Sequence, residues 1–262
     1  MIDNACFYKK NTAMKNAILS GLYQALTLKF IVAVLGTVIS IFLGSLDSLI
    51  RCLQQQGLLP AGFVYSFFYN ALSSDSVLSF LPIVSVLPFA GTYVEDQKNK
   101  FCRFFLIRCS HIDYSFSRIF VAFLCGCGVV ILGTFIAWGG AILFFLPKQF
   151  AQEMSLSPIV QIMEKQLLLS LGGGLWSVLG MTVSTIMESK YTAYATPFIT
   201  YFLLVMLCER YFPNVFLLYP PNWMAPELWP YGVWGAAIFL LELTLSDGIL
   251  FIFRSERKLQ EL

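Results

Sequence analysis

Residues 93–118 read YVEDQKNKFCRFFLIRCSHIDYSFSR and form the largest block of charge in a chain that is otherwise mostly apolar. The block lies between two uncharged runs, 76–94 and 119–145, each long enough to cross a bilayer. A short segment rich in charge and aromatic rings has no hydrophobic core of its own to build. We therefore interpret it as a cytoplasmic segment that contacts something outside the membrane.

The composition indicates an integral membrane protein. Only 12% of the 262 residues are charged, 58% are hydrophobic, and the mean hydropathy is +0.73. Soluble domains carry about 25% charged residues, so this chain lacks the polar residues that a water-facing surface needs. The net charge of +2 is too small to indicate a nucleic-acid partner.

The hydropathy pattern predicts an all-α integral membrane protein with six transmembrane helices in one domain, residues 1–262. A spanning helix needs about 20 mostly apolar residues. The predicted spans cover residues 30–46, 76–94, 119–145, 166–187, 191–208 and 228–253. The segment 94–118 then links the second and third spans, and 147–165 is expected to be a polar loop. Between the fifth and sixth spans, 209–231 holds five prolines, which exclude a regular helix.

An amphipathic helix is predicted ahead of the first span, over residues 13–29. Its apolar and polar side chains separate onto two faces, which is typical of a helix lying in the membrane interface. The apolar face holds Met14, Ile18, Leu22, Ala25 and Leu26, and the polar face holds Asn16, Ser20, Gln24 and Thr27. The alternative is that this segment is only an extended start of the first span.

The distribution of Lys and Arg predicts that both termini are cytoplasmic, because inner loops carry the excess of positive charge. With the N-terminus inside, four of the 17 Lys and Arg residues lie outside: Arg51, Lys148, Lys165 and Arg210. The inner residues are Lys9, Lys10, Lys15, Lys29, Lys98, Lys100, Arg103, Arg108, Arg118, Lys190, Arg254, Arg257 and Lys258.

No pattern of catalytic or metal-ligating residues is present, so we expect no enzyme and no metal site in this chain. There is one histidine, His111, and no Gly-x-x-x-x-Gly-Lys-Ser/Thr phosphate loop. The seven cysteines are an odd number and suggest no disulfide framework. The glycine run 172–174 lies inside the fourth span, where close helix packing explains it.

The pattern within residues 93–118 predicts a short helix. Phe101, Phe104, Phe105 and Arg108 recur at the spacing of one helical face. Glu95 and Asp96 suit a helix start, and Arg103 with Arg108 suits its later turns. Two interpretations remain open from this pattern. The helix couples to a soluble partner through its aromatic side chains, or it lies on the membrane with its phenylalanines in lipid.

The order of these elements resembles the permeases of bacterial ABC-2-type transporters. The resemblance rests on residues 80–90, on Glu95-Asp96 followed by 104–108 and 114–118, and on 175–180 with Lys190-Tyr191. It implies a multi-pass permease of the bacterial cell membrane, paired with a second permease chain, identical or related. It also implies a separate ABC ATPase dimer that binds ATP and Mg²⁺. The ATPase would contact Glu95, Asp96, Phe101, Arg103, Phe104, Phe105 and Arg108.

The same resemblance implies export, with no cofactor in this chain. The abundant aromatic and aliphatic residues, 25 Phe among them, fit an amphipathic or hydrophobic substrate, and they fit a lipid-facing surface equally well. The alternative is an autonomous secondary transporter driven by an ion gradient, for which the prolines at 82, 88 and 197 are the only hint. Glu242 and Asp247 lie inside the sixth span, about 140° apart on a helix. For Glu242 a substrate path and a hydrogen-bonded packing role both remain open, and Asp247 is expected to pair with an inner basic residue.

Overall fold

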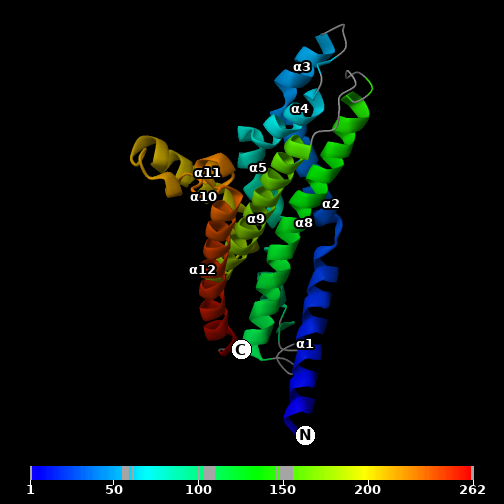
Figure 1. Cartoon of the computed structure of the whole chain (residues 1–262). Coiled ribbons are helices and arrows are strands. Elements are labelled where there is room, and N and C mark those ends of the chain that lie inside the picture. Colours follow the sequence, from blue (N-terminus) through cyan, green and yellow to red (C-terminus); the bar gives the residue numbers. More distant parts are fainter. Residues whose placement is uncertain are drawn as a thin grey trace.

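A computed structural model of the chain describes residues 2–54, 59–60, 62–99, 101–102, 110–145, 147 and 156–260. Every element in this part of the chain is a helix, and together they form an elongated bundle (Figure 1). The helices are α1 (Ile2–Ala25), α2 (Leu28–Gly44), α3 (Leu46–Gln54), α4 (Phe63–Leu72), α5 (Asp75–Val86), α6 (Thr92–Lys98), α8 (His111–Phe145), α9 (Leu156–Met187), α10 (Lys190–Arg210), η2 (Phe216–Leu218), α11 (Pro220–Trp223), η3 (Pro226–Leu228) and α12 (Val233–Gln260).

Four of the described helices are long and apolar enough to cross a membrane: α8, α9, α10 and α12. The pair α1 and α2 passes the same test together and is bent by 64° at the break between them. The protein is therefore all-helical, with four or five long apolar helices that suit a multi-pass membrane protein. This confirms the predicted fold class at that level.

The break between α1 and α2 lies at Leu26 and Thr27. Thr27 has an extended backbone, with φ −113° and ψ −178°, so the helix stops and a new one begins at Leu28. On α1, Ile18 and Leu22 of the predicted apolar face pack against the bundle, whereas Leu26 is exposed. Gln24, which the helical pattern assigned to the polar face, points toward α6 and α8 instead.

The segment 76–94, predicted as one span, is two helices in the structure. α5 ends at Val86, turns follow, and α6 begins at Thr92. Pro88 explains the break, because proline has no amide hydrogen and its ring clashes with the preceding turn of a helix. At 12 residues, α5 is a short apolar helix. The segment is apolar, as predicted, but it does not form one continuous helix.

Other helices extend beyond their predicted spans. α8 begins at His111 rather than 119, and α12 continues past 253 to Gln260. α9 begins at Leu156, inside the segment predicted as a polar loop, and buries Ile162 against the core in these added turns. Hydropathy marks only the apolar part of a helix, so polar turns that continue it are missed. The bounds of α2 and α10 lie close to the predicted 30–46 and 191–208.

α9 is the centre of the bundle and packs against α4, α5, α8, α10 and α12. In its most apolar window 78% of the residues are buried, against 22% in α10. The close packing predicted for the glycine run 172–174 is confirmed at Gly173. A Cβ on Gly126 of α8 would lie only 2.4 Å from the Gly173 carbonyl oxygen, so glycine is needed for the two backbones to approach.

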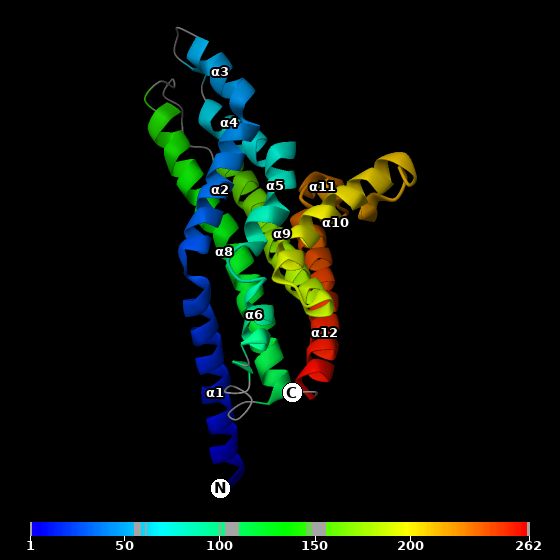
Figure 2. The same cartoon turned by 180° about the vertical axis from the view of Figure 1, so that it is seen from behind.

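Both ends of the described chain lie at the same end of the bundle, and α6 lies toward that end (Figures 1 and 2). α9 and α10 are joined there by a two-residue turn in which Glu188 has a left-handed φ of 54°. α10 then tilts outward from the other long helices (Figure 2). Of the segment 209–231, the first two residues end α10, and the rest forms only the short helices η2, α11 and η3, as its prolines predicted.

Candidate functional site

Residues 99–110, which we call the coupling segment, follow α6, and the structure describes the two ends of this segment. Arg103, Phe104, Phe105 and Arg108 lie outside the described residues. Phe101 is exposed, and its amide donates to the Asp96 carbonyl oxygen at 2.9 Å, which closes the chain back onto α6. Next to it, the buried Cys102 lies with its Sγ 3.4 Å from the Tyr114 hydroxyl of α8, so Cys102 is held against the bundle.

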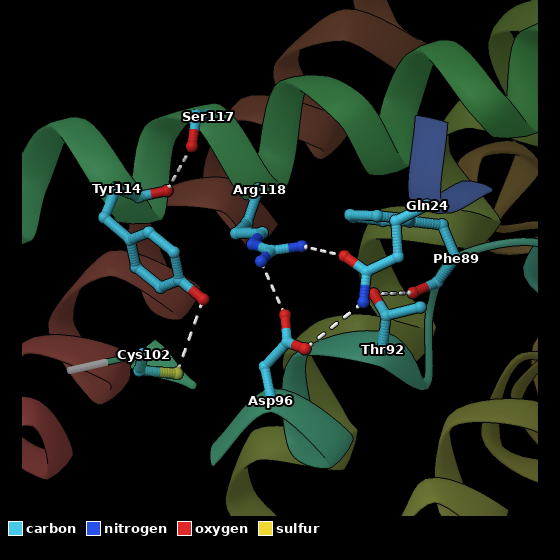
Figure 3. A network of polar contacts seen from close by, with 8 residues as sticks. All are labelled: Gln24, Phe89, Thr92, Asp96, Cys102, Tyr114, Ser117 and Arg118. Atoms are coloured by element: carbon cyan, nitrogen blue, oxygen red, sulfur yellow. Dashed lines mark hydrogen bonds and ion pairs between the residues drawn. The ribbon is translucent and has the colours of Figure 1, made fainter. Parts of the chain in front are cut away.

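A buried network of three polar side chains joins α6 to α1 and α8 (Figure 3). Arg118 Nη2 of α8 lies 2.5 Å from Asp96 Oδ2 of α6. Gln24 of α1 closes the ring, since its Nε2 donates to Asp96 Oδ1 at 3.2 Å and its Oε1 accepts from Arg118 Nη1 at 2.9 Å. Asp96 is 6% exposed and Arg118 4%. We call these three residues the polar clamp.

Aromatic rings surround the guanidinium of the clamp. Arg118 lies over the Tyr114 ring at 5.1 Å and the Phe89 ring at 5.6 Å. Such contacts stabilise a cation that has lost its water. They also separate the Asp96–Arg118 ion pair from solvent, which strengthens its Coulomb attraction.

Burial raises the pKa of the Asp96 carboxyl above its ordinary value, while Arg118 and the Gln24 amide act in the opposite direction. Removing two charges from water costs several kcal/mol per ion, and their attraction offsets this cost only with full hydrogen bonding. The clamp is thus costly to separate rather than strongly stabilising in itself. Moving one of the three helices alone would separate the buried charges and cost free energy, so we expect the three helices to move together.

Glu95, next to Asp96, makes a different contact. Its Oε1 accepts from Lys190 Nζ of α10 at 3.2 Å. The Lys190 and Glu95 side chains are 44% and 37% exposed, so water and salt screen this pair. It links α6 to the start of α10 without locking the two helices together.

α12 also reaches α6 at this end of the bundle. The Tyr93 ring of α6 packs edge-on against Phe251 of α12, with ring centroids 4.9 Å apart. A buried hydrogen bond between Ser115 and Ser255, 2.8 Å long, joins α8 to α12. The seven-residue helix α6 therefore contacts α1, α8, α10 and α12 through Tyr93, Glu95 and Asp96, which lie within about one turn.

Of the two carboxylates predicted inside the sixth span, neither belongs to this site. Glu242 is exposed on α12, and Asp247 is half-buried in a groove between α9, α10 and α12. The expected ion pair between Asp247 and a basic residue is not formed within the described residues, because Arg254 and Arg257 line the groove elsewhere along α12.

Sequence reasoning singled out Asp96 but missed its partners. The sequence analysis counts Arg118 as an inner positive charge and as the end of the 114–118 segment, and it places Gln24 on a polar face, without pairing either with Asp96. A weak signal was present, since Arg118 directly precedes the longest uncharged run, where a charge needs a partner. Nothing in one sequence indicates which residue supplies that partner.

The polar clamp connects three helices through buried polar contacts. Within the described ranges, no group of three or more His, Cys, Asp or Glu side chains is placed to hold a metal ion. The side chains of the clamp are tied to one another and surrounded by aromatic rings, so they are not placed to react with a ligand. No protein-family model, curated protein or solved structure matches the chain.

Proposed function

We propose that this chain is the transmembrane permease subunit of an ATP-driven exporter of the ABC-2 type, in a bacterial cell membrane. A separate ATPase dimer would supply the energy, and a second permease chain, identical or related, would complete the pathway. The substrate class is amphipathic or hydrophobic. The proposal rests on the resemblance of residues 80–118 and 175–191 to that family and on the contacts of α6.

The observation that carries the proposal is the convergence of four long helices on α6, directly before the coupling segment. A push on residues 99–110 acts first on α6, because Phe101 and Cys102 fasten the start of the segment to the bundle. The polar clamp then moves α8 and α1 together with α6. A rigid connection of this kind is what converts movement of a soluble motor into rearrangement of spans.

The contacts of α1 support the same proposal. α1 meets α2 at 64° and packs along α8 (Figure 1). Gln24 couples α1 to α6. Movement of the coupling segment would therefore reach α1 as well as α8.

The test replaces the two adjacent phenylalanines of the coupling segment by glutamate, Phe104→Glu with Phe105→Glu. Two buried carboxylates at an interface with the ATPase disrupt docking, so ATPase association and ATP-driven export should both be lost. The measurements are co-purification of the ATPase and ATP-dependent export from inside-out vesicles.

A matched control is the pair Tyr211→Glu with Phe212→Glu. These two exposed aromatic residues follow α10, at the far end of that helix from the α9–α10 turn. The control should leave ATPase association unchanged. If the Phe104 and Phe105 variant kept both association and transport, the coupling role would be wrong, and transport that follows an ion gradient without ATP would favour the secondary transporter.

A further inference from the structure

A groove of about 520 Å³ runs along one face of α12, between this helix, α9 and α10. Its volume lies in the range of small-molecule sites. The lining residues of α12 recur at helical spacing on one face: Asp247, Leu250, Phe253, Arg254 and Arg257. α9 forms the floor with Leu179, Thr182, Val183 and Ile186, and α10 contributes Thr200.

The groove is open toward the side of the bundle. α9 packs closely against both α10 and α12, whereas α10 and α12 have little contact with each other. Figure 2 shows α10 tilting away from the other helices. Leu250 and Phe253 are both largely exposed along the opening. A lipid-soluble molecule could therefore enter between α10 and α12 from the bilayer.

Asp247 is the unusual residue of this groove. It lies within α12 about 16 Å along the helix from Lys258, which pairs with Glu188 at the α9–α10 turn. Its carboxylate has no ion-pair partner in the described part of the chain, and the Thr182 hydroxyl donates to its backbone oxygen at 3.4 Å. Acidic groups inside spanning helices are costly unless a cation or polar groups offset their charge, so they mark sites of function.

We propose that this groove binds a lipophilic cation, with its positive charge beside Asp247 and its apolar body against Leu179, Val183 and Leu250. Thr182 lies beside Asp247, and Thr200 of α10 also lines the groove, so both hydroxyls are available for polar contacts with the ligand. This inference rests on the proposed transport function, since the lipophilic cation would be the substrate that the permease carries.

The two arginines set the direction in which such a cation is held. Arg254 and Arg257 lie about 10 and 15 Å further along α12 than Asp247 and are exposed. Their charge repels a cation from the end of the groove near the α9–α10 turn, whereas the Asp247 carboxylate attracts it. An anionic amphiphile would instead place its charge at the arginines and leave Asp247 unpaired.

The experiment measures binding of radiolabelled tetraphenylphosphonium to the full chain in phosphatidylcholine nanodiscs, without the ATPase. Triphenylphosphine oxide, of similar shape but neutral, serves as the competitor. Asp247→Asn keeps the side-chain size and removes the charge, so it should weaken binding at least about tenfold. The matched control, Glu242→Gln, removes an exposed carboxylate from the same helix and should leave binding unchanged.

Saturable binding that needs Asp247 and that the neutral compound does not displace would support the proposal. Equal loss of binding in the Glu242 variant, or displacement by the neutral compound at similar concentration, would overturn it. The competition uses the wild-type chain, so it decides the matter even if Asp247→Asn fails to fold. Since no ATPase is present, absence of binding would reject the cation site and leave the proposed exporter function to its own test.

Discussion

Glu95 and Asp96 are neighbours on α6 and are both acidic, yet the structure places them in opposite environments. Glu95 reaches outward to Lys190 and stays partly in water, whereas Asp96 is buried against Arg118 and Gln24. Successive residues of a helix point about 100° apart, which is enough to separate a solvated face from a packed one. One short helix therefore makes an adjustable link to α10 and a fixed link to α1 and α8.

These two environments determine where movement can occur at this end of the bundle. A screened pair on the surface can part and re-form at little cost, because water replaces each lost contact. A buried pair cannot, since each separated charge would remain in an environment of low polarity. We infer that α6, α8 and α1 move as one body, while α10 can shift relative to them.

The largest expected effect on stability comes from removing one partner of the buried Asp96–Arg118 ion pair. Asp96→Ala leaves the Arg118 guanidinium without its carboxylate, and we expect the free energy of unfolding to fall by about 3–5 kcal/mol. The measurement is reversible unfolding of the chain in mixed micelles with increasing sodium dodecyl sulfate. A loss no greater than that of an ordinary surface substitution would show that Arg118 is not isolated from water.

Replacing both charges together should be much milder. In Asp96→Leu with Arg118→Met neither charge is left unpaired, so the double variant should regain about 2 kcal/mol or more over Asp96→Ala. The same unfolding titration compares the single and double variants. Additive losses would contradict the idea that the ion pair, rather than each side chain alone, determines the cost.

A smaller loss is expected at the third member of the clamp. Gln24→Ala removes one donor and one acceptor from charged groups, which costs about 1–2 kcal/mol. Ser20→Ala, on an exposed face of the same helix, is the matched control and should have no measurable effect. If the two variants unfolded alike, Gln24 would not belong to the clamp in solution.

The smallest effect should come from the exposed side of α6. Glu95→Gln removes the ion pair with Lys190, but water already screens that pair, so the change in stability should be near the limit of detection. Any difference from wild type should vanish in 1 M salt, where the screening length is about 3 Å. A large, salt-independent loss would mean that Glu95 is as buried as Asp96 in the membrane.

The fold class could be predicted from the sequence because it depends on composition. Few charges and long apolar runs leave little choice other than a helical membrane protein, and the glycine run 172–174 indicated close helix packing correctly. The break at residues 87–91 was missed because hydropathy reports average apolarity rather than helix continuity. Pro88 carried the signal for it.

The polar clamp could not be predicted from the sequence for a different reason. Asp96 and Arg118 are 22 residues apart in sequence, and Gln24 is 94 residues from Arg118. Their meeting depends on how α1, α6 and α8 pack, which one sequence does not reveal. A polar residue on an amphipathic helix is expected to face water. Gln24 instead points into the bundle and donates to Asp96.

A decisive test of the proposed exporter function is affinity purification of this chain from its native membrane, with mass spectrometry and an ATP-hydrolysis assay. We expect a stoichiometric partner that carries a phosphate-loop motif, together with vanadate-sensitive hydrolysis, and the stoichiometry of the same sample gives the number of permease chains. A purified chain without any ATPase, active in ion-driven transport, would contradict it and assign residues 93–118 to the membrane surface.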